Sequence, residues 1–335
     1  MKVKDIGEFG LIERVAALVG GMGPPGAAEE MAGCSLILGI GDDAAAWRIN
    51  GLSHLFTTDT LVEGVHFLPG RVPWRDLGWK AMAVNYSDIA AMGGNPIYSL
   101  VTLGVTGEES LESVDELYRG MLDVCRAYGG RIVGGDLVRS ATPFISVALL
   151  GVARGPLLRR SGARPGDLIA VTGPLGASAG GLRILKEGLA LPQEAERPLV
   201  EAHLRPRPRL EEGQRLAALG VQAAMDISDG LLDDLQKMCQ ASGVAARLQE
   251  WQVPVHPVLA RAFPREAMGM ALSGGEDYEL LFAAPEHVMD RVLVSLPSPA
   301  FVIGHVSEGT AGQVVLADRN GKEVLWTRGG WDHFR

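Results

Sequence analysis

The chain has 335 residues, 47% apolar and 21% charged, which is ordinary for a globular protein but more than one core usually holds, so we expect two domains. A net charge of -9 argues against a general nucleic-acid binder. Three scattered cysteines fit a reducing compartment better than a disulfide framework. No apolar stretch is long enough to span a bilayer, and Glu13 and Arg14 interrupt the early apolar run. We therefore expect a cytoplasmic protein with no nucleic-acid or membrane partner.

The N-terminal stretch predicts a helix over 11–19, followed by a Gly/Pro-rich loop over 20–33 to which no role is assigned. A short strand over 36–40 leads to Gly41-Asp42-Asp43, where Asp also suits a tight turn. The apolar run 53–56 predicts a strand that ends in the hydroxyls and carboxylate of 57–60. Taken alone, this segment fits a solvated loop at least as well as a ligand-binding one.

Residues 76–92 have helical spacing, and Gly93-Gly94 stops the helix. Asp88 lies near its C-terminal end, where a carboxylate meets the negative end of the dipole at a cost of roughly 0.3–1 kcal/mol. A bound cation would offset this cost. We therefore interpret Asp88 as a ligand rather than as a solvated surface charge.

Strands are predicted over 97–105, 131–135 and 143–153, with a helix over 110–128, and the strand 131–135 runs into Asp136. The connector 159–167 shifts in composition, and we divide the chain nearby into domains 1–155 and 156–335. Arg160 in this connector is either an ordinary exposed charge or a guanidinium aimed at a phosphate.

In the second half of the chain, predicted strands and helices alternate as they do in the first half. Strands are predicted over 168–172, 223–227 and 301–306, and helices over 178–188, 210–219, 231–241 and 285–296. A Gly-rich loop over 273–279 enters another strand, a hairpin turn is expected at Asn320-Gly321, and the basic segment 203–209 is interpreted as a linker. Asp229 could be a helix N-cap, and Asp233 and Asp234 are interpreted as first-turn acids. This alternation predicts an α/β or α+β architecture in each half.

Acids at five predicted strand or helix ends stand among Gly, Ser and Thr, which suits Mg²⁺. There is no Gly-x-x-x-x-Gly-Lys-Ser/Thr loop, no Gly-x-Ser-x-Gly elbow, no zinc pair and no complete dinucleotide fingerprint. A phosphate acceptor would need no base, because it is already ionised. Unit charges about 4 Å apart repel by roughly 4 kcal/mol at an effective dielectric of about 20, and two dianions by about four times that. Several Mg²⁺ ions would remove most of this barrier.

Five motifs together resemble the thiamine-monophosphate kinase family, within the superfamily of aminoimidazole ribonucleotide synthetase and selenophosphate synthetase. The resemblance covers nearly the whole chain. The motifs are Gly-Asp-Asp-Ala-Ala (41–45), Thr-Asp-Thr-Leu-Val-Glu-Gly-Val-His-Phe (58–67), Ser-Asp-Ile-Ala-Ala-Met-Gly (87–93), Met-Asp-Ile-Ser-Asp-Gly-Leu (225–231) and Ser-Gly-Gly-Glu-Asp-Tyr-Glu-Leu (273–280).

The resemblance implies a two-domain aminoimidazole-ribonucleotide-synthetase-like fold whose N-terminal domain pairs with its copy in a homodimer and whose C-terminal α/β domain completes the substrate site. It implies direct in-line phosphorylation of thiamine monophosphate by ATP with several Mg²⁺ ions, the last step of thiamine diphosphate biosynthesis. The implied Mg²⁺ ligands are Asp43, Thr57, Thr58, Asp59, Asp88, Asp136, Asp226 and Asp229, of which Asp59, Asp88, Asp136 and Asp226 are also implied to be catalytic. The implied ATP contacts are Tyr118, Gly135, Asp136, Arg160 and Ser228, and the implied thiamine-phosphate contacts are His66, Glu276 and Trp331.

Two other functions stay open at this point. One is an ATP-dependent synthase of the same superfamily. Cys34, however, lacks the neighbouring Lys of selenophosphate synthetases. The related hydrogenase maturation proteins end in a functional Cys, whereas this chain ends in Trp-Asp-His-Phe-Arg. The other is a non-enzymatic nucleotide sensor, which would bind ATP without turnover. The intact set of acids favours the kinase.

Overall fold

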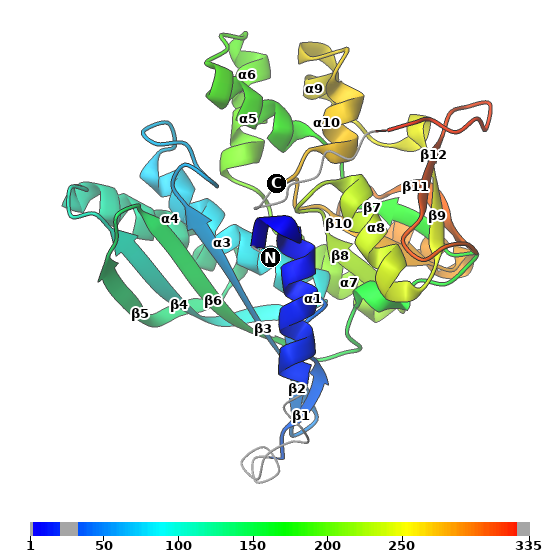
Figure 1. Cartoon of the computed structure of the whole chain (residues 1–335), viewed down its shortest axis with the longest axis horizontal. Coiled ribbons are helices and arrows are strands. Elements are labelled where there is room, and N and C mark those ends of the chain that lie inside the picture. Colours follow the sequence, from blue (N-terminus) through cyan, green and yellow to red (C-terminus); the bar gives the residue numbers. More distant parts are fainter. Residues whose placement is uncertain (1–2, 21–32, 327–335) are drawn as a thin grey trace.

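The structure is a computed structural model that describes residues 3–20 and 33–326. Its described strands form two six-stranded sheets, one in each half of the chain (Figure 1). The first sheet has the strand order β1-β2-β3-β6-β4-β5, and the second has the order β12-β9-β11-β7-β10-β8. The strands of the first sheet are β1 (Ser35–Leu38), β2 (Ala45–Ile49), β3 (Leu52–Val62), β4 (Asn95–Val105), β5 (Arg131–Arg139) and β6 (Phe144–Ala153).

Two long helices, α3 and α4, pack against each other, and α3 lies against β3 and β6 of the first sheet. They approach closely at two glycines. A Cβ on Gly78 would lie 1.9 Å from the carbonyl oxygen of Leu117, and one on Gly120 would lie 1.8 Å from that of Arg75. Only glycine fits at such distances, so the two helices are held in one fixed crossing. The helical segments of the first half are η1 (Val3–Asp5), α1 (Gly7–Gly20), α3 (Trp74–Ala91) and α4 (Leu111–Tyr128).

The second sheet is mostly antiparallel and is accompanied by helices of the second half. Its strands are β7 (Leu168–Val171), β8 (Ala223–Asp226), β9 (Ala245–Gln249), β10 (Leu280–Ala284), β11 (Phe301–Ser307) and β12 (Val314–Ala317). The helical segments are η2 (Arg160–Gly162), α5 (Ala177–Glu187), α6 (Gln193–Leu204), α7 (Leu210–Leu219), α8 (Leu231–Ser242), η3 (Glu250–Gln252), α9 (Pro257–Ala262), α10 (Ala267–Ser273) and α11 (Glu286–Ser295). Our sequence prediction omitted α6, α9, α10, β2 and β9. The predicted two-domain α/β fold is confirmed.

The two halves share one hydrophobic core. Ala90 of α3 belongs to the same buried cluster as Leu216 of α7 and Phe282 of β10. The contact is close, since a Cβ on Gly213 would lie 2.0 Å from the carbonyl oxygen of Ala90. This packing brings the end of β8 over the C-terminal end of α3, which is where the acids of both halves meet. The boundary between residues 155 and 156 falls in the connection between the two sheets and stays a prediction.

Two predicted strand ends are wrong. β3 does not end at Thr57 but continues to Val62, and β5 continues past Asp136 to Arg139. The residues that we expected on loops therefore alternate between the two faces of a strand. Hydroxyls and a carboxylate imitate turn chemistry in the sequence, but long ladders to β6 hold β3 extended and pairing with β4 holds β5.

The face of the first sheet opposite α3 carries exposed apolar side chains. Phe56, Tyr98 and Leu100 keep 46%, 49% and 49% of their surface exposed. Register places them on one face, because Phe56 and Tyr98 both pair with Leu150 while Leu100 pairs with Ala148. A contiguous exposed apolar patch of this kind marks an interaction surface. Within the described residues we find no helix with the length and apolar character that a bilayer crossing requires.

Candidate active site

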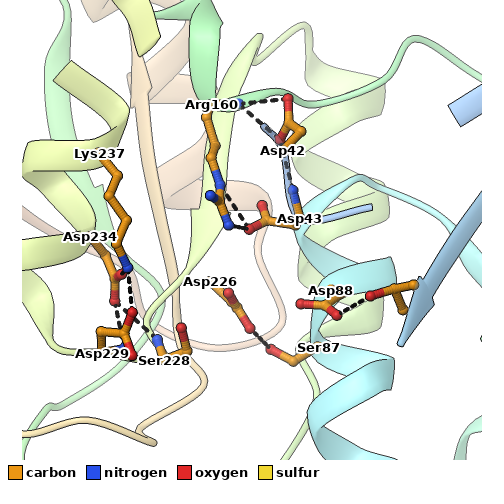
Figure 2. Close-up of polar contacts among 11 residues, drawn as sticks. Asp42, Asp43, Ser87, Asp88, Arg160, Asp226, Ser228, Asp229, Asp234 and Lys237 are labelled. Carbon is orange, nitrogen blue, oxygen red and sulfur yellow. Dashed lines mark hydrogen bonds and ion pairs between the residues drawn. The ribbon is translucent and has the colours of Figure 1, made fainter. Parts of the chain in front are cut away.

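Three aspartates from three distant segments converge. Asp43 follows β1 in a turn, Asp88 lies in the last turn of α3, and Asp226 ends β8. Each offers a carboxylate oxygen, and these oxygens all lie within 4.8 Å of one another (Figure 2). The sequence predicted all three as ligands of one site, and their convergence meets the main structural requirement of that prediction.

Nearby cationic side chains do not fully balance the negative charge of the Asp43, Asp88 and Asp226 carboxylates. Burial is the main reason that the pKa values of Asp88 and Asp226 are raised well above the usual range, and neighbouring acids raise them further. Thr57 Oγ1 donates to Asp88 Oδ2 at 2.5 Å, and Ser87 Oγ donates to Asp226 Oδ2 at 2.6 Å. The buried Oδ2 of Asp43 has no hydrogen-bond partner among the described residues. An unpartnered buried carboxylate oxygen in an all-oxygen donor set fits a hard divalent cation such as Mg²⁺.

Asp59 extends this cluster from β3. Its backbone amide donates to Asn85 Oδ1 at 3.0 Å, which ties β3 to α3. Burial raises the pKa of its carboxyl group, a hydrogen bond with Asp88 opposes that shift, and the charges of Asp229 and Asp43 raise the pKa further. Asp59 is therefore a fourth carboxylate at the edge of the site.

Thr57 and Thr58 lie on opposite faces of β3, because successive side chains in a strand alternate. Thr57 shares the face of Asp59 and reaches Asp88. Thr58 pairs with Ala148 and lies on the face that carries the exposed apolar patch. Thr57 and Thr58, which we predicted to be ligands of the same site, therefore point to opposite faces of the sheet.

Arg160 supplies part of the missing positive charge. Its Nε lies 3.0 Å from Asp43 Oδ1, and its terminal Nη2 also donates to that oxygen. Its backbone amide donates to Asp42 Oδ1 at 3.3 Å, while burial and the charge of Asp43 raise the pKa of Asp42 to about 6. The guanidinium therefore lies at the acid cluster, where it could contact a phosphate that enters with cations.

Asp229 belongs to a second acidic group beside the first. It forms an ion pair with Lys237, which also pairs with Asp234 at 2.7 Å (Figure 2). Asp234 is a first-turn acid of α8, as predicted, but it is also fully buried. Its Oδ2 accepts hydrogen bonds from the backbone amides of Ser228, Asp229 and Gly230 at 3.0–3.1 Å. Asp234 thus holds the turn that contains Ser228 and Asp229, two predicted site residues. The available signal in the sequence was an acid four residues after Gly230, in the first turn of the predicted helix.

A cavity of about 780 Å³ opens beside the acids. Asp59, Ser228 and Asp229 line it on the acidic side, and His66 and Glu276 line it elsewhere. Apolar side chains form much of the remaining wall, among them Leu61, Val65, Phe67, Val72 and Leu182. One cavity thus joins the predicted acceptor contacts to the acid cluster, and its mixed wall suits a ligand with an apolar ring and a charged group.

His66 has a defined tautomer in this cavity. Its Nδ1 lies 3.1 Å from the backbone amide of Val62, which can only donate, so Nδ1 accepts. In the neutral ring the proton then resides on Nε2. A neutral His66 in this tautomer carries a donor, Nε2–H, on a side chain that lines the cavity.

The other predicted contacts do not join the site within one chain. Asp136 and Gly135 lie on the edge strand β5, separated from β3 by β6 and β4. Three strand spacings amount to roughly 14 Å. Tyr118 lies in α4, packed against the first core. Trp331, like most of the loop 20–33, lies outside the described residues.

The sequence interpretation of segment 203–209 as a linker is wrong at its start. His203 is the penultimate residue of α6 and is 3% exposed. Lys80, to which no role was assigned, is 2% exposed and lies 2.7 Å from Glu276. The available signal for Lys80 was a single lysine inside an otherwise apolar helical face.

Both halves of the chain are similar to known proteins. Residues 41–153 match the family model of the AIR synthase related protein, N-terminal domain, and residues 164–317 match that of the C-terminal domain. The chain is 40% identical over 306 residues to the thiamine-monophosphate kinase of Escherichia coli (strain K12), covering 89% of this chain and 92% of that protein. It is 36% identical to that of Bacillus subtilis (strain 168), covering 90% and 94%.

A solved structure described as AaThiL complexed with AMPPCP and TMP is also similar. It superposes with a TM-score of 0.85 at 34% identity, covering 99% of each chain. The likeness therefore extends through both halves rather than through one domain. With both family models matched and relatives similar over nearly their whole length, this chain belongs to the thiamine-monophosphate kinase family.

Proposed function

We propose that this chain transfers the terminal phosphoryl group of ATP to the phosphate of thiamine monophosphate and so forms thiamine diphosphate. The observation that carries the proposal is the convergence of Asp43, Asp88 and Asp226 beside a cavity with a mixed apolar and polar wall. The likeness to thiamine-monophosphate kinases, one solved with AMPPCP and TMP, names the two ligands.

The acids suit this reaction because both reactants are anionic. An acceptor phosphate is ionised at neutral pH and needs no base, so the main barrier is repulsion between two phosphates. Asp43, Asp59, Asp88 and Asp226 are the residues that would hold Mg²⁺, with Asp229 at the neighbouring turn. Bound there, Mg²⁺ would neutralise phosphate charge and align donor and acceptor for in-line transfer. Arg160 at Asp43 adds a fork-shaped donor for a phosphate.

The acceptor end of the cavity has separate chemistry. His66 offers its Nε2 proton to the substrate phosphate, and Glu276 offers a carboxylate to the cationic, ring-bearing end of thiamine monophosphate. The apolar wall between them excludes water from the ring. On this assignment the acceptor phosphate points to the acids, and the ring points away from them.

A homodimer would explain why Gly135 and Asp136, two predicted site residues, lie far from the acid cluster of their own chain. Asp136 pairs with Thr102 and lies on the face of the first sheet that carries Tyr98 and Leu100. If two copies pair through this face about a twofold axis centred between β6 and β4, β5 of one copy lies over β3 of its partner. Asp136 of one chain would then approach Thr58 of the other, on the side of β3 opposite to Asp59. We therefore propose that each active site takes Gly135 and Asp136 from the second copy.

The reaction is tested directly by phosphorus NMR. ATP is supplied with thiamine monophosphate, with thiamine, or with an aminoimidazole precursor, at equal enzyme and Mg²⁺ concentrations. The proposal expects ADP and thiamine diphosphate from the first mixture only. Phosphate release with the aminoimidazole precursor would favour the synthase alternative, and ATP binding without any turnover would favour the sensor.

Mg²⁺ binding is expected to release protons and to strengthen as the pH rises. Burial raises the folded-state pKa of Asp88 and Asp226 above the unfolded value, so the cation-free site holds protons that a cation must displace. For the same reason, the contribution of these groups to cation-free stability is full below the unfolded pKa of about 3.9 and is lost as the pH rises through the folded value. Calorimetric titration with Mg²⁺ in two buffers of different ionisation enthalpy, at several pH values, measures the release. Affinity that does not change with pH would contradict the cation assignment.

Trp331→Ala is expected to raise the KM for thiamine monophosphate more than the KM for ATP, because an indole can stack on the cationic substrate ring. Steady-state kinetics with each substrate varied in turn measures both values. Trp326→Ala is the matched control, since Trp326 packs on the second core. A larger change in the KM for ATP would assign the C-terminal tail to the nucleotide instead.

A further inference from the structure

Two buried side chains with no role so far lie at the acceptor cavity: Lys80 outside its lining, and His203 within the lining near Glu276. Lys80 comes from α3 in the first half of the chain, and His203 comes from the end of α6 in the second. Both contact Glu276, which lines the cavity from the loop before β10. Lys80 Nζ lies 2.7 Å from Glu276 Oε1, and His203 Nδ1 lies 3.3 Å from Glu276 Oε2.

The Lys80 ammonium group is almost completely removed from water, with 2% of its side chain exposed. A buried ammonium is tolerated only with a well-placed partner. Within residues 3–20 and 33–326, Glu276 is the carboxylate with which it forms an ion pair. Because Lys80 is fixed by the packing of α3, this pair also fixes the position of Glu276.

The hydrogen-bond directions among the three groups follow from their chemistry. Lys80 Nζ can only donate, and it lies 3.5 Å from His203 Nε2, so Nε2 is the acceptor. Burial and the charge of Lys80 lower the pKa of His203 to about 4, so the ring is neutral at physiological pH. Its proton is then on Nδ1, which lies 3.1 Å from Ser178 Oγ and 3.3 Å from Glu276 Oε2. Glu276 Oε1 thus receives the Lys80 ammonium group, and Oε2 faces the N–H edge of the His203 ring.

Glu276 is held in a backbone conformation that it would not adopt by itself. Its φ angle is 64°, in the left-handed region that disfavours side chains other than glycine. Its amide donates to the carbonyl oxygen of Ser228 at 2.7 Å, and the amide of Tyr278 donates to that of Ile227 at 2.9 Å. Strain of this kind persists where surrounding contacts impose it, commonly at ligand-binding sites.

Glu276 is also kept ionised. Burial alone would raise the pKa of its carboxyl group, but the charge of Lys80 and its hydrogen bond to Glu276 oppose burial, and the pKa is lowered. At neutral pH the cavity therefore presents a carboxylate whose charge is balanced from behind by a buried ammonium. Such a carboxylate has one orientation and one charge state before any ligand arrives.

We propose that Lys80 and His203 are positioning residues that hold the Glu276 carboxylate in one orientation for the cationic, ring-bearing end of the acceptor substrate. This inference rests on the proposed function and deepens it, because it names the residues that set acceptor affinity. A group fixed by partners behind it loses little freedom on binding, so its interaction is realised almost fully. Lys80 and His203 themselves act through Glu276 rather than through contact with the nucleotide.

The test uses Lys80→Met in the full-length enzyme, since methionine keeps length and apolar character but removes the charge. We expect the KM for thiamine monophosphate to rise by about tenfold or more and the KM for ATP to change by less than about twofold. His203→Leu is also expected to raise the KM for thiamine monophosphate. Lys322→Met, at an exposed turn, removes the same charge and is expected to leave both constants unchanged.

A second arm covers the case in which Lys80→Met alone does not fold because it leaves a buried carboxylate unpaired. The double variant Lys80→Met/Glu276→Gln removes both charges and is compared with Glu276→Gln. If Lys80 acts through Glu276, adding Lys80→Met to the Glu276→Gln background changes the KM for thiamine monophosphate by less than about twofold. The full tenfold change in that background would overturn the inference.

The two proposals fail in different ways. A wild-type enzyme that forms no thiamine diphosphate would refute the proposed function. A wild-type enzyme that forms it, combined with a Lys80→Met variant whose two KM values both stay unchanged or rise equally, would refute only the positioning role.

Discussion

Asp88→Asn is expected to remove nearly all phosphoryl transfer and, at the same time, to raise the melting temperature of the cation-free protein. Asp88 is central to the cluster: its carboxylate lies with those of Asp43 and Asp226 within 4.8 Å, and Thr57 donates to it. An amide keeps the size and can still accept from Thr57, but it carries no charge. Repulsion among the remaining acids falls, so the cation-free fold gains stability.

The loss of turnover follows from the same change. A divalent cation that loses one of its buried carboxylates binds more weakly, and the charge between the two phosphates is then poorly neutralised. We expect a fall in kcat of about 10²–10³-fold or more, comparable to the loss of one preorganised electrostatic group. The increase in melting temperature that Mg²⁺ gives the wild-type protein should also shrink.

The measurements are steady-state turnover and thermal unfolding with and without Mg²⁺. Asp290→Asn is the matched control, because Asp290 is exposed on α11 and its substitution should change neither quantity. Full turnover by Asp88→Asn would show that the acid cluster is not the cation site. Lost turnover with an unchanged Mg²⁺-induced stabilisation would mean that Asp88 acts on the substrates rather than on the cation.

Mixing two inactive variants, Asp136→Asn and Asp226→Asn, is expected to restore activity. Each variant alone has a lesion in every site. If the site joins Asp226 of one chain with Asp136 of its partner, half of randomly reassorted dimers are mixed, and each mixed dimer has one intact site. The mixture should therefore reach about one quarter of wild-type turnover per chain under twofold symmetry.

Subunit exchange under mild denaturant, followed by refolding and turnover assays, makes this measurement. The control mixes Asp88→Asn with Asp226→Asn, whose lesions lie in the same cluster of one chain, so the mixture stays inactive. No recovery in the Asp136 mixture would show that Asp136 acts in its own chain or has no part in the site. A Leu100→Asp variant should be inactive and monomeric by light scattering, because it places a charge in the apolar sheet face.

The convergent acids were predictable because their signals are local. Asp43 follows a short strand and a glycine, Asp88 stands where the helix dipole disfavours a carboxylate, and Asp226 ends an apolar strand. Asp43 by itself also suits a tight turn. The recurrence of acids among Gly, Ser and Thr at predicted strand and helix ends, rather than any one position, therefore indicated a shared cation.

The residues that the sequence misjudged depend on contacts far along the chain. Thr57 and Asp136 have the composition of turn residues, but ladders to neighbouring strands keep β3 and β5 extended through them. His203 stands in a basic, proline-rich segment, yet the packing of α6 buries it. Propensity covers a few residues at a time, and tertiary pairing overrides it.

By itself, the sequence determined the alternating α/β architecture in two halves, the identity of the acids and the class of chemistry that they serve, because these depend on periodicity and on residue type. Only the tertiary structure decided which side of β3 each threonine faces, that Lys80 lies behind Glu276, and that Asp234 holds a turn. Those outcomes require α3, α6 and the loop before β10 to meet in one place. Burial and pairing are properties of the assembled core, and no local stretch of residues contains them.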